Sequence, residues 1–488
     1  MHINKLNSIE KSRSNFTLIY VLVIALLNII FYKNFFVSLF IVIIELTILL
    51  KHLLKRDIYK YFINYLIFTS LSLEQEFLVG TDQFYGFKNF RIGGINLAIL
   101  ALLPPVCIIL IKGIDFSQLK KKYMFYKTFV IFSILTINGI FWGMLTLAVN
   151  DNGIQSFPNV ISLFVNRSYF FVIVMGVLLI LAYLYINDES RFKLIGDVLL
   201  YILISTAITM VFSLIFSYKG TYSNIETLLV PLASWMVPFL LIVPFYTNKK
   251  YKFTILLLGV IGTLLTIIYN ATGKGLILVM IIPFIFFFLS ISKKKYPIAF
   301  IMIIIAFLGI LIIPNMLQDL AINSQLTQNK SNEVMGLLKF WEPNWLKNMP
   351  TSPRYRVVEF IDICIEYIKK PYYLFFGKGY IGTFKDHILG FNMGYQSAFS
   401  YQEYVRNIFY APHDAINNIL LTNGLLGMMS FLYFIKLVIN NGKKSFWLIF
   451  GIYWVLIMYG FSITLSVFGI TGLMFGLSEI YDKDEQMK

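Results

Sequence analysis

Long runs of apolar residues, each about the length of a membrane-crossing helix, constrain this chain more than any other feature. A helix needs about 20 mainly apolar residues to cross the hydrocarbon core of a bilayer. By this criterion we predict about fourteen membrane helices in the 488 residues. Only 14% of the residues are charged, against roughly 25% in water-soluble domains. We therefore expect an all-α polytopic membrane protein rather than a soluble one.

The predicted helices divide the chain into three parts. Residues 1–314 hold about eleven helices, residues 315–412 form one long polar segment, and residues 413–488 hold the last helices and a short tail. The final apolar stretch can form one tilted helix or two short helices in a hairpin, and we prefer the hairpin. The predicted helices have the approximate limits 16–32, 35–50, 61–79, 92–111, 125–149, 168–186, 194–217, 225–246, 253–270, 275–291, 297–314, 415–435, 445–460 and 464–481.

Lys and Arg predict how the chain is oriented in the membrane. If the N-terminus is cytoplasmic, the eight cytoplasmic segments carry 25 Lys and Arg when Lys127 in the first turn of the helix 125–149 is counted with them, and the six short outer loops carry 6. The remaining 10 lie in residues 315–412, and loops of that length count little in the positive-inside rule. We therefore expect both termini in the cytoplasm and residues 315–412 outside. The net charge of +16 is explained by clusters that orient helices, so no nucleic-acid partner is needed.

The long outer segment is rich in aromatic residues and contains a predicted amphipathic helix. Between residues 340 and 410 there are nineteen Phe, Tyr and Trp, which suit either sugar rings or a membrane interface. We predict the helix over 354–370, lying against the membrane domain with its apolar stripe. That stripe comprises Val357, Ile361, Cys364, Ile365 and Ile368, with the carboxylates of Glu359, Asp362 and Glu366 on the opposite face.

The first turn of this predicted helix carries two arginines, Arg354 and Arg356. The helix dipole already places partial positive charge there, so acidic residues are the usual choice. A phosphate or diphosphate bound at the N-terminus would explain the arginines. Alternatively, both side chains reach lipid phosphates or the nearby Glu342 and Glu359.

One histidine lies where the long segment re-enters the membrane. His413 stands between Pro412 and Asp414, and Asn417 follows one turn later. A neutral imidazole can accept a proton at neutral pH, as a general base that activates a sugar hydroxyl must do. The alternative is a helix cap or an ordinary interface residue.

A further cation, Lys274, stands in a short turn between two apolar helices on the predicted outer side. It suits a phosphate, although a lone lysine of this kind is more often a snorkelling residue. Three separate segments thus bring Lys274, Arg354, Arg356 and His413 to one predicted membrane face. This coincidence favours an anion-handling site more strongly than any single residue does.

The spacing of these residues resembles that of a known family. His413 and Asp414 are followed by nine residues and then by Gly424 and Gly427. Residues 255–480 are in this respect similar to the O-antigen polymerase and O-antigen ligase superfamily of bacterial membrane glycosyltransferases. The family pattern has Asn, Ser or Gln where this chain has Asp414.

An upstream pattern of the same family also matches. Arg356 opens an amphipathic helix fifteen residues before Pro371, which leads into the Gly-rich run of residues 376–379. A second family arginine, in a turn that begins a helix, corresponds to Lys274. This replacement keeps the charge and loses the bidentate fork of a guanidinium.

The resemblance implies a C-type glycosyltransferase-like membrane fold, whose outer loop caps a cavity for lipid-diphosphate-linked sugars. It implies a metal-independent enzyme without cofactors, and the acidic pair Glu74 and Glu76 offers only a weak metal hypothesis. On this basis we expect catalytic roles for His413, Arg356 and Lys274. We expect substrate-binding roles for Arg354, Asp414, Asn417 and Lys378.

The expected function is polymerisation of a cell-surface polysaccharide at the bacterial inner or plasma membrane. The enzyme would move a glycan from undecaprenyl diphosphate to another lipid-linked repeat unit with inversion. Its expected partners are the undecaprenyl-diphosphate-linked oligosaccharide, membrane lipid, a chain-length regulator and a flippase. One alternative is an O-antigen ligase that transfers to a lipid A core. Another is a flippase or transporter, against which the scarcity of intramembrane charges argues, Glu45 and Asp197 being the few examples.

Overall fold

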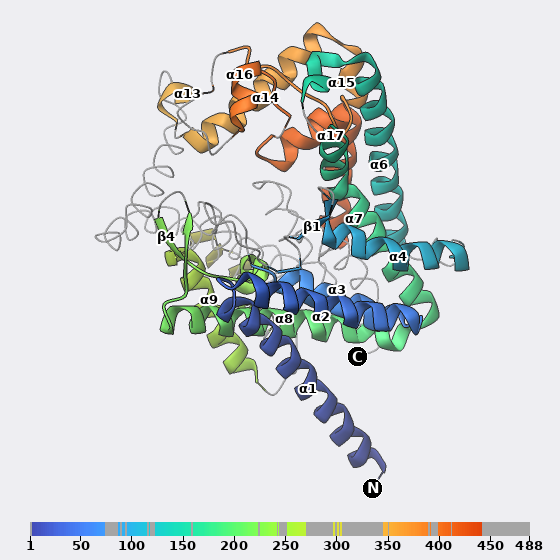
Figure 1. Ribbon diagram of the computed structural model, residues 1–488, viewed down its shortest axis with the longest axis vertical. Coiled ribbons are helices and arrows are strands. Elements are labelled where there is room, and N and C mark those ends of the chain that lie inside the picture. Colours follow the sequence, from blue (N-terminus) through green and yellow to red (C-terminus); the bar gives the residue numbers. More distant parts are fainter. Residues whose placement is uncertain are drawn as a thin grey trace. The chain divides into compact units, whose positions relative to one another are not determined.

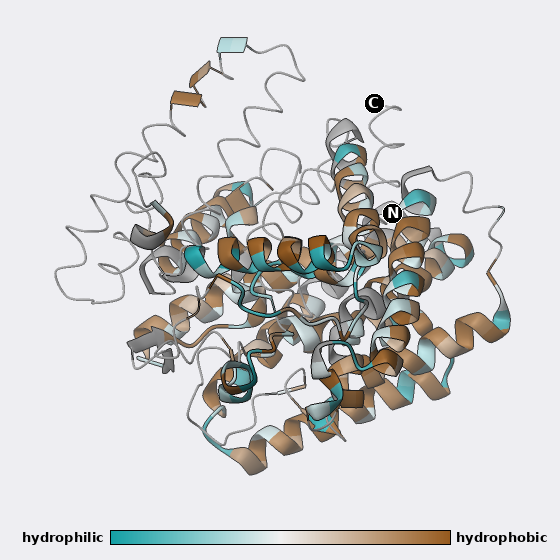
Figure 2. Ribbon diagram, turned by 90° about the horizontal axis from the view of Figure 1, so that it is seen from above, coloured by the Kyte–Doolittle hydropathy of each residue, from teal (hydrophilic) through white to brown (hydrophobic). Residues whose placement is uncertain are grey.

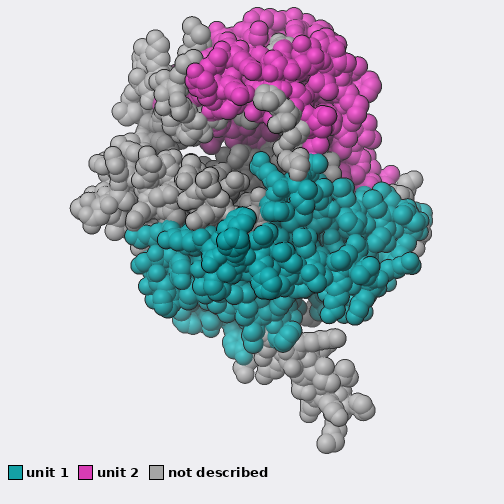
Figure 3. Space-filling view, in the orientation of Figure 1, with its two compact units in different colours: residues 1–118, 179–271 teal, residues 119–178, 272–488 magenta. Residues whose placement is uncertain are grey.

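The structure is a computed structural model, and it is mostly helical (Figure 1). It describes residues 2–73, 86–87, 90–92, 95–114, 117, 123–157, 160–222, 225–241, 243, 251–269, 296–297, 300–301, 303–304, 345–349, 351–388, 391, 399–410 and 412–441. The chain forms two compact units, coloured separately in Figure 3. Unit 1 comprises residues 1–118 and 179–271, and unit 2 comprises residues 119–178 and 272–488.

Unit 1 consists mainly of apolar helices, several of which begin at a polar N-cap residue. Its helices are α1 (His2–Ile30), α2 (Phe35–Leu54), α3 (Ile58–Leu71), α4 (Leu97–Lys112), α8 (Glu189–Ile215) and α9 (Lys252–Tyr269). Asn34, Asp57 and Asp188 cap α2, α3 and α8, each accepting a hydrogen bond from the backbone N–H three residues later. α1 and α3 pack against α8, and nearly every side chain of α3 is buried.

Two short antiparallel ribbons and a 3₁₀ helix also belong to unit 1. β1 (Arg91–Ile92) pairs with β2 (Ile95–Asn96), and β3 (Lys219–Tyr222) pairs with β4 (Ile225–Leu228). The 3₁₀ helix η3 (Leu232–Leu241) follows β4. The prediction of a membrane helix over 225–246 is therefore wrong. Pro231 precedes η3 and Pro238 lies inside it, and proline both lacks an N–H and disrupts a continuous α-helix.

Unit 2 combines long apolar helices with short helices from the segment after residue 340. Its elements are α6 (Tyr123–Val149), η2 (Asp151–Ser156), α13 (Trp345–Asn348), α14 (Thr351–Lys369), α15 (Tyr372–Phe376), α16 (Tyr401–Arg406) and α17 (Ala415–Asn441). α7 (Val160–Asn187) starts in this unit. Figure 1 shows α14, α15 and α16 gathered at one end of α6 and α17, and both α14 and α15 pack against α17.

Several helices have the length and composition expected of membrane spans. Among the described residues, four qualify, namely Phe35–Leu54, Tyr126–Val149, Ser190–Ile215 and Ala415–Phe434. Shorter apolar helices include Phe16–Ile30, Leu97–Lys112, Val174–Asn187 and Lys252–Thr266. In the ribbon coloured by hydropathy, hydrophobic residues predominate along the long helices (Figure 2). The predicted spans 275–291, 445–460 and 464–481, and most of 297–314, lie outside the described residues.

Candidate active site

A glycine-rich loop fixes the geometry of the candidate site by joining α6 to α17. Residues 377–380 follow α15, and the backbone N–H groups of Lys378 and Gly379 donate to the carbonyls of Leu421 and Thr422 in α17, at 2.8 and 3.0 Å. On the other side, the N–H of Tyr380 donates to the carbonyl of Gly139 in α6 at 3.1 Å. The loop is thus hydrogen-bonded to two long helices at once.

The glycines of this loop allow a backbone approach that side chains would block. Gly379 has a φ of +72°, and a Cβ there would lie 1.9 Å from the backbone nitrogen of Gly143 in α6. Gly377 faces Gly424, whose own φ of 57° interrupts the helical backbone of α17. Asn138 of α6 donates to the Phe376 carbonyl at 2.8 Å. The backbone of the Gly-rich run therefore packs directly against the backbone of α17 at Gly424.

α14 packs against α17, and its carboxylates are buried. Glu359, Asp362 and Glu366 are all buried, whereas Ile368 is 78% exposed and Phe360 is also exposed. The prediction that the apolar stripe of this helix is the packed face is wrong. The carboxylates can be buried because polar groups of neighbouring segments meet each of them. The predicted helix limits, 354–370, agree with Thr351–Lys369 to within a few residues.

Glu359 and His413 form the centre of the candidate site. The carboxylate oxygen Oε2 of Glu359 accepts the backbone N–H of His413 at 2.9 Å. Its other oxygen, Oε1, contacts Nδ1 of the His413 imidazole. The Glu359 side chain is 0% exposed and that of His413 is 26% exposed. One nitrogen of the imidazole is thus held by a buried carboxylate while part of the ring remains accessible.

Asp414 and Asn417 complete the start of α17. Asp414 accepts the backbone N–H of Asn417 at 2.7 Å and so caps the helix. The Asn417 amide Nδ2 lies 3.1 Å from both Glu359 Oε2 and Asp414 Oδ2, and 2.8 Å from the Arg356 carbonyl oxygen. Burial, with a further contribution from the charge of Glu359, raises the pKa of Asp414 to about 6.

Arg356 lies beside this group on the first turns of α14. Its charge partly offsets the effect of burial on the pKa of Asp414. The guanidinium is half-buried, and its buried Nε has no hydrogen-bond partner among the residues that the structure describes. Arg354, two residues earlier on α14, is also half-buried. A cation with an unused donor therefore lies near the Asp414 carboxylate.

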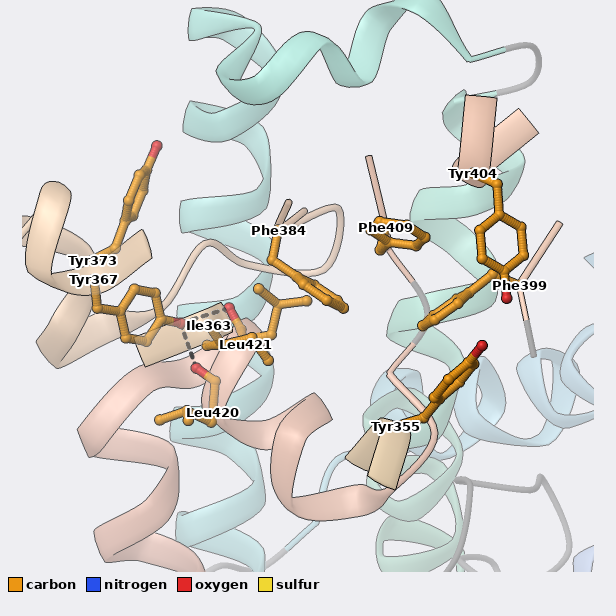
Figure 4. Close-up of a cluster of buried hydrophobic side chains, with 10 residues drawn as sticks. All are labelled: Tyr355, Ile363, Tyr367, Tyr373, Phe384, Phe399, Tyr404, Phe409, Leu420 and Leu421. Atoms are coloured by element: carbon orange, nitrogen blue, oxygen red, sulfur yellow. Dashed lines mark hydrogen bonds between the residues drawn. The ribbon is translucent and has the colours of Figure 1, made fainter. Parts of the chain in front are cut away.

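A cluster of aromatic rings encloses the other side of the imidazole. The His413 ring lies edge-to-face with Phe399, at 4.7 Å between centroids, and 6.3 Å from Tyr355. Phe399 in turn packs against Phe409 and Tyr404. We call these rings the aromatic cluster, and Figure 4 shows all of its members except Phe391, reaching in from different segments. Its described members are Tyr355, Phe384, Phe391, Phe399, Tyr404 and Phe409.

A second charged network lies toward the C-terminal end of α14. The Lys378 ammonium is fully buried, 3.2 Å from both Asp151 Oδ2 and Glu366 Oε2, and it donates to the Thr383 carbonyl at 2.8 Å. Asp151 also pairs with Lys370, and these lysines lower the pKa of Asp151 despite its burial. Asp151, in the turn after α6, therefore lies beside residues 370–378 of the long polar segment.

These contacts revise two of the predicted substrate-binding residues. The three donors of the Lys378 ammonium are engaged by Asp151, Glu366 and the Thr383 carbonyl, and the side chain has no exposed surface. Its role in this structure is therefore structural. The Asn417 amide is likewise buried and bridges three protein acceptors. Neither side chain is open to a ligand in this structure, so its contacts do not support a substrate-binding role for Lys378 or Asn417.

The remaining predicted residues have different outcomes. The structure brings Arg356, His413 and Asp414 together where α14 and α17 begin. Arg354 lies near the start of α14, two residues before Arg356. Lys274 lies outside the described residues, as do Glu74 and Glu76. In the part of the chain that is described, no group of three or more His, Cys, Asp and Glu residues is arranged to hold a metal ion.

The sequence reasoning missed Glu359 as a partner of His413. It treated the carboxylates of the 354–370 helix as a polar outer face. The available signal was their spacing of three and seven residues, which places all of them on one helix face. A row of carboxylates on one helix face is either exposed to water or paired with cations and histidines from other segments.

Comparison with known proteins adds no assignment to this geometry. The sequence has no match among known protein families, and it has none among curated proteins. The conclusions about this site therefore depend on its residues, their contacts and their burial.

Proposed function

We propose that this protein is a membrane glycosyltransferase that polymerises a cell-surface polysaccharide. It would transfer a growing glycan from undecaprenyl diphosphate to the sugar of another lipid-linked repeat unit. The observation that carries the proposal is the group formed by Glu359, His413 and Arg356. It combines a base that Glu359 orients with a cation whose Nε–H donor has no described hydrogen-bond partner.

In the proposed reaction, His413 acts as general base. Its Nδ1 is engaged by Glu359, and no described residue hydrogen-bonds its Nε2. Nε2 takes the proton of the acceptor hydroxyl as that oxygen attacks the anomeric carbon of the donor sugar. The bond between the anomeric carbon and the diphosphate oxygen breaks on the opposite face, and the configuration inverts.

The leaving diphosphate carries the electron pair of the broken bond and needs cations close by. Arg356, with Arg354, would stabilise this charge through charge-assisted hydrogen bonds. Lys274 would be the third cation that stabilises the diphosphate, because the sequence places it in a turn on the predicted outer side. The aromatic cluster next to His413 is buried, so it would hold the imidazole ring in place. The sugar rings would instead pack on exposed aromatic side chains of the same segment.

The position of the site along the chain favours a substrate anchored in lipid. The candidate membrane span Ala415–Phe434 begins two residues after His413. A diphosphate at the end of a polyprenyl chain lies at the same level of a bilayer, where hydrocarbon meets water. The proposal therefore includes a multi-pass protein of the bacterial inner or plasma membrane, with the site outside and both termini in the cytoplasm.

The test is the length distribution of the surface glycan in a strain whose chromosomal copy is replaced by variants. We expect His413→Ala and Arg356→Ala to yield single repeat units at the cell surface, with protein levels similar to wild type. Lys385→Ala is the matched control, because Lys385 is an exposed cation of the same segment, and it should retain long polymer.

Other outcomes of this experiment identify the alternatives. Long polymer in both site variants contradicts the proposal. Repeat units trapped inside the cell would indicate a flippase instead. Normal polymer that no longer reaches a lipid A core would indicate a ligase.

A further inference from the structure

Glu359 is unusual among the carboxylates of α14 because it holds one residue at two points. Oε2 accepts the backbone N–H of His413 at 2.9 Å, and Oε1 contacts Nδ1 of the same residue. The Asn417 amide donates to Oε2 at 3.1 Å. Both oxygens of a fully buried carboxylate are thus used to fix the main chain and the ring of residue 413 together.

This arrangement determines which imidazole nitrogen carries hydrogen. An ionised carboxylate only accepts hydrogen bonds, so the nitrogen that faces Oε1 must be protonated. In a neutral imidazole the proton is therefore on Nδ1, and the lone pair is on Nε2. A carboxylate at this position also stabilises the positive ring that forms once Nε2 has accepted a second proton.

We propose that Glu359 is the positioning residue of the reaction, which sets the tautomer and orientation of His413 and stabilises its protonated form. The inference rests on the proposed function, because it assigns a role within that chemistry. Glu359 has no exposed surface, so it acts through His413 and does not touch the substrate.

The same helix provides an internal comparison. Glu366, two turns further along α14, accepts from Nε2 of His387 at 2.8 Å, so it too forms a carboxylate–histidine pair. There, however, the second ring nitrogen, Nδ1, lies 3.0 Å from the Lys369 ammonium. Because a lysine ammonium can only donate, both nitrogens of His387 are engaged, and this pair has no lone pair left for catalysis.

The two pairs give matched variants for the experiment. Purified full-length protein in proteoliposomes is assayed for glycan transfer from lipid-linked repeat units, and kcat, KM and the pH–rate profile are measured. Glu359→Gln removes the charge and keeps the shape, whereas Glu366→Gln does the same at the pair that the proposal leaves outside the reaction. The thermal midpoint of each variant reports on folding.

For Glu359→Gln we expect kcat to fall roughly 100-fold or more, with little change in KM. The acidic limb of the pH–rate profile should move to lower pH, because the imidazolium loses its stabilising carboxylate. Glu359→Asp keeps the charge and shortens the reach, so it should recover part of kcat and restore the acidic limb. Glu366→Gln should leave kcat and the profile unchanged.

The outcomes separate this inference from the proposed function. Loss of transfer in His413→Ala, together with an unchanged kcat and profile in Glu359→Gln, overturns the role of Glu359 and leaves the proposed function intact. Equal loss of thermal midpoint and activity in Glu359→Gln and Glu366→Gln, without a shifted profile, means that both carboxylates are only structural. Full transfer in His413→Ala overturns the proposed function itself.

Discussion

At the scale of single residues, the buried carboxylates of α14 differ in how they are satisfied. Glu359 meets His413 and Asn417, and Glu366 meets Lys378 and His387. Asp362 lies between them and accepts backbone N–H groups of the following loop, from His387 at 2.9 Å and from Ile388. Burial, with a contribution from the nearby charge of Asp386, raises the pKa of Asp362 to about 7. None of the described groups that shift the pKa of Asp362 is a cation.

This gives a stability prediction with a definite sign for Asp362→Asn. A folded pKa of about 7, above the model value of 3.8, means that the folded state binds the proton more tightly than the unfolded chain. The contribution of Asp362 to stability therefore falls as pH rises from about 4 to about 7. Asn keeps the acceptor oxygen and does not titrate. At pH 8 we expect the variant to be more stable than wild type, by an amount on the order of 4 kcal/mol.

The measurement is the thermal midpoint of the purified protein in detergent at several pH values. The advantage of Asp362→Asn should shrink toward pH 4, where the wild-type carboxyl is neutral in the folded state. A variant that is equally less stable than wild type at pH 4 and pH 8 would mean that the hydrogen bond geometry matters more than the charge.

At the scale of elements, the close contact between the Gly-rich loop and α6 gives a second prediction. Gly379→Ala should destabilise the protein by roughly 3 kcal/mol or more, because it adds a clash with Gly143 to the strain of a positive φ. Gly113→Ala is the matched control. Its φ is +77°, but no atom lies within 4 Å of the added Cβ, so only the backbone strain of about 1 to 3 kcal/mol remains.

Thermal midpoints of the two alanine variants, measured side by side, test this explanation of the glycine pattern. A similar small shift for both would show that the loop can move away from α6 at little cost. A much larger shift for Gly379→Ala supports the view that these glycines are needed for backbone packing rather than for contact with a ligand.

The elements also show what could be predicted from the sequence. The limits expected from apolar runs agree closely for α6, α9 and α17, because a long apolar run is itself the physical requirement for a spanning helix. Hydropathy could not show that residues 225–241 form a strand and a 3₁₀ helix. Local prolines and pairing with β3 decide that region, and pairing depends on a partner strand.

The orientation of α14 illustrates a second limit. The sequence period showed which residues share a face, but it could not show which face is packed. Glu359 is buried because His413 and Asn417, more than fifty residues away, supply donors to it. Arg356, His413 and Asp414 could be proposed from local spacing, whereas Glu359 required knowledge of these long-range contacts.

At the scale of the whole molecule, unit 2 alone contains the described residues of the candidate site. The short helices of the long polar segment and the turn after α6 lie at one end of this unit, held together by Asp151 and Lys370 and by the loop on α17. The candidate membrane span in α17 starts at the same end. This arrangement would allow a site for sugars and diphosphate to border directly on the lipid that carries them.

The most direct test of the central claim uses the purified full-length protein in liposomes with lipid-diphosphate-linked repeat units. The units are isolated from a strain that lacks the protein, and the products are separated by size. The account predicts a ladder of glycans for wild type and for Lys385→Ala, and single units for His413→Ala. A ladder made by His413→Ala, or no ladder from the wild-type protein, would contradict it.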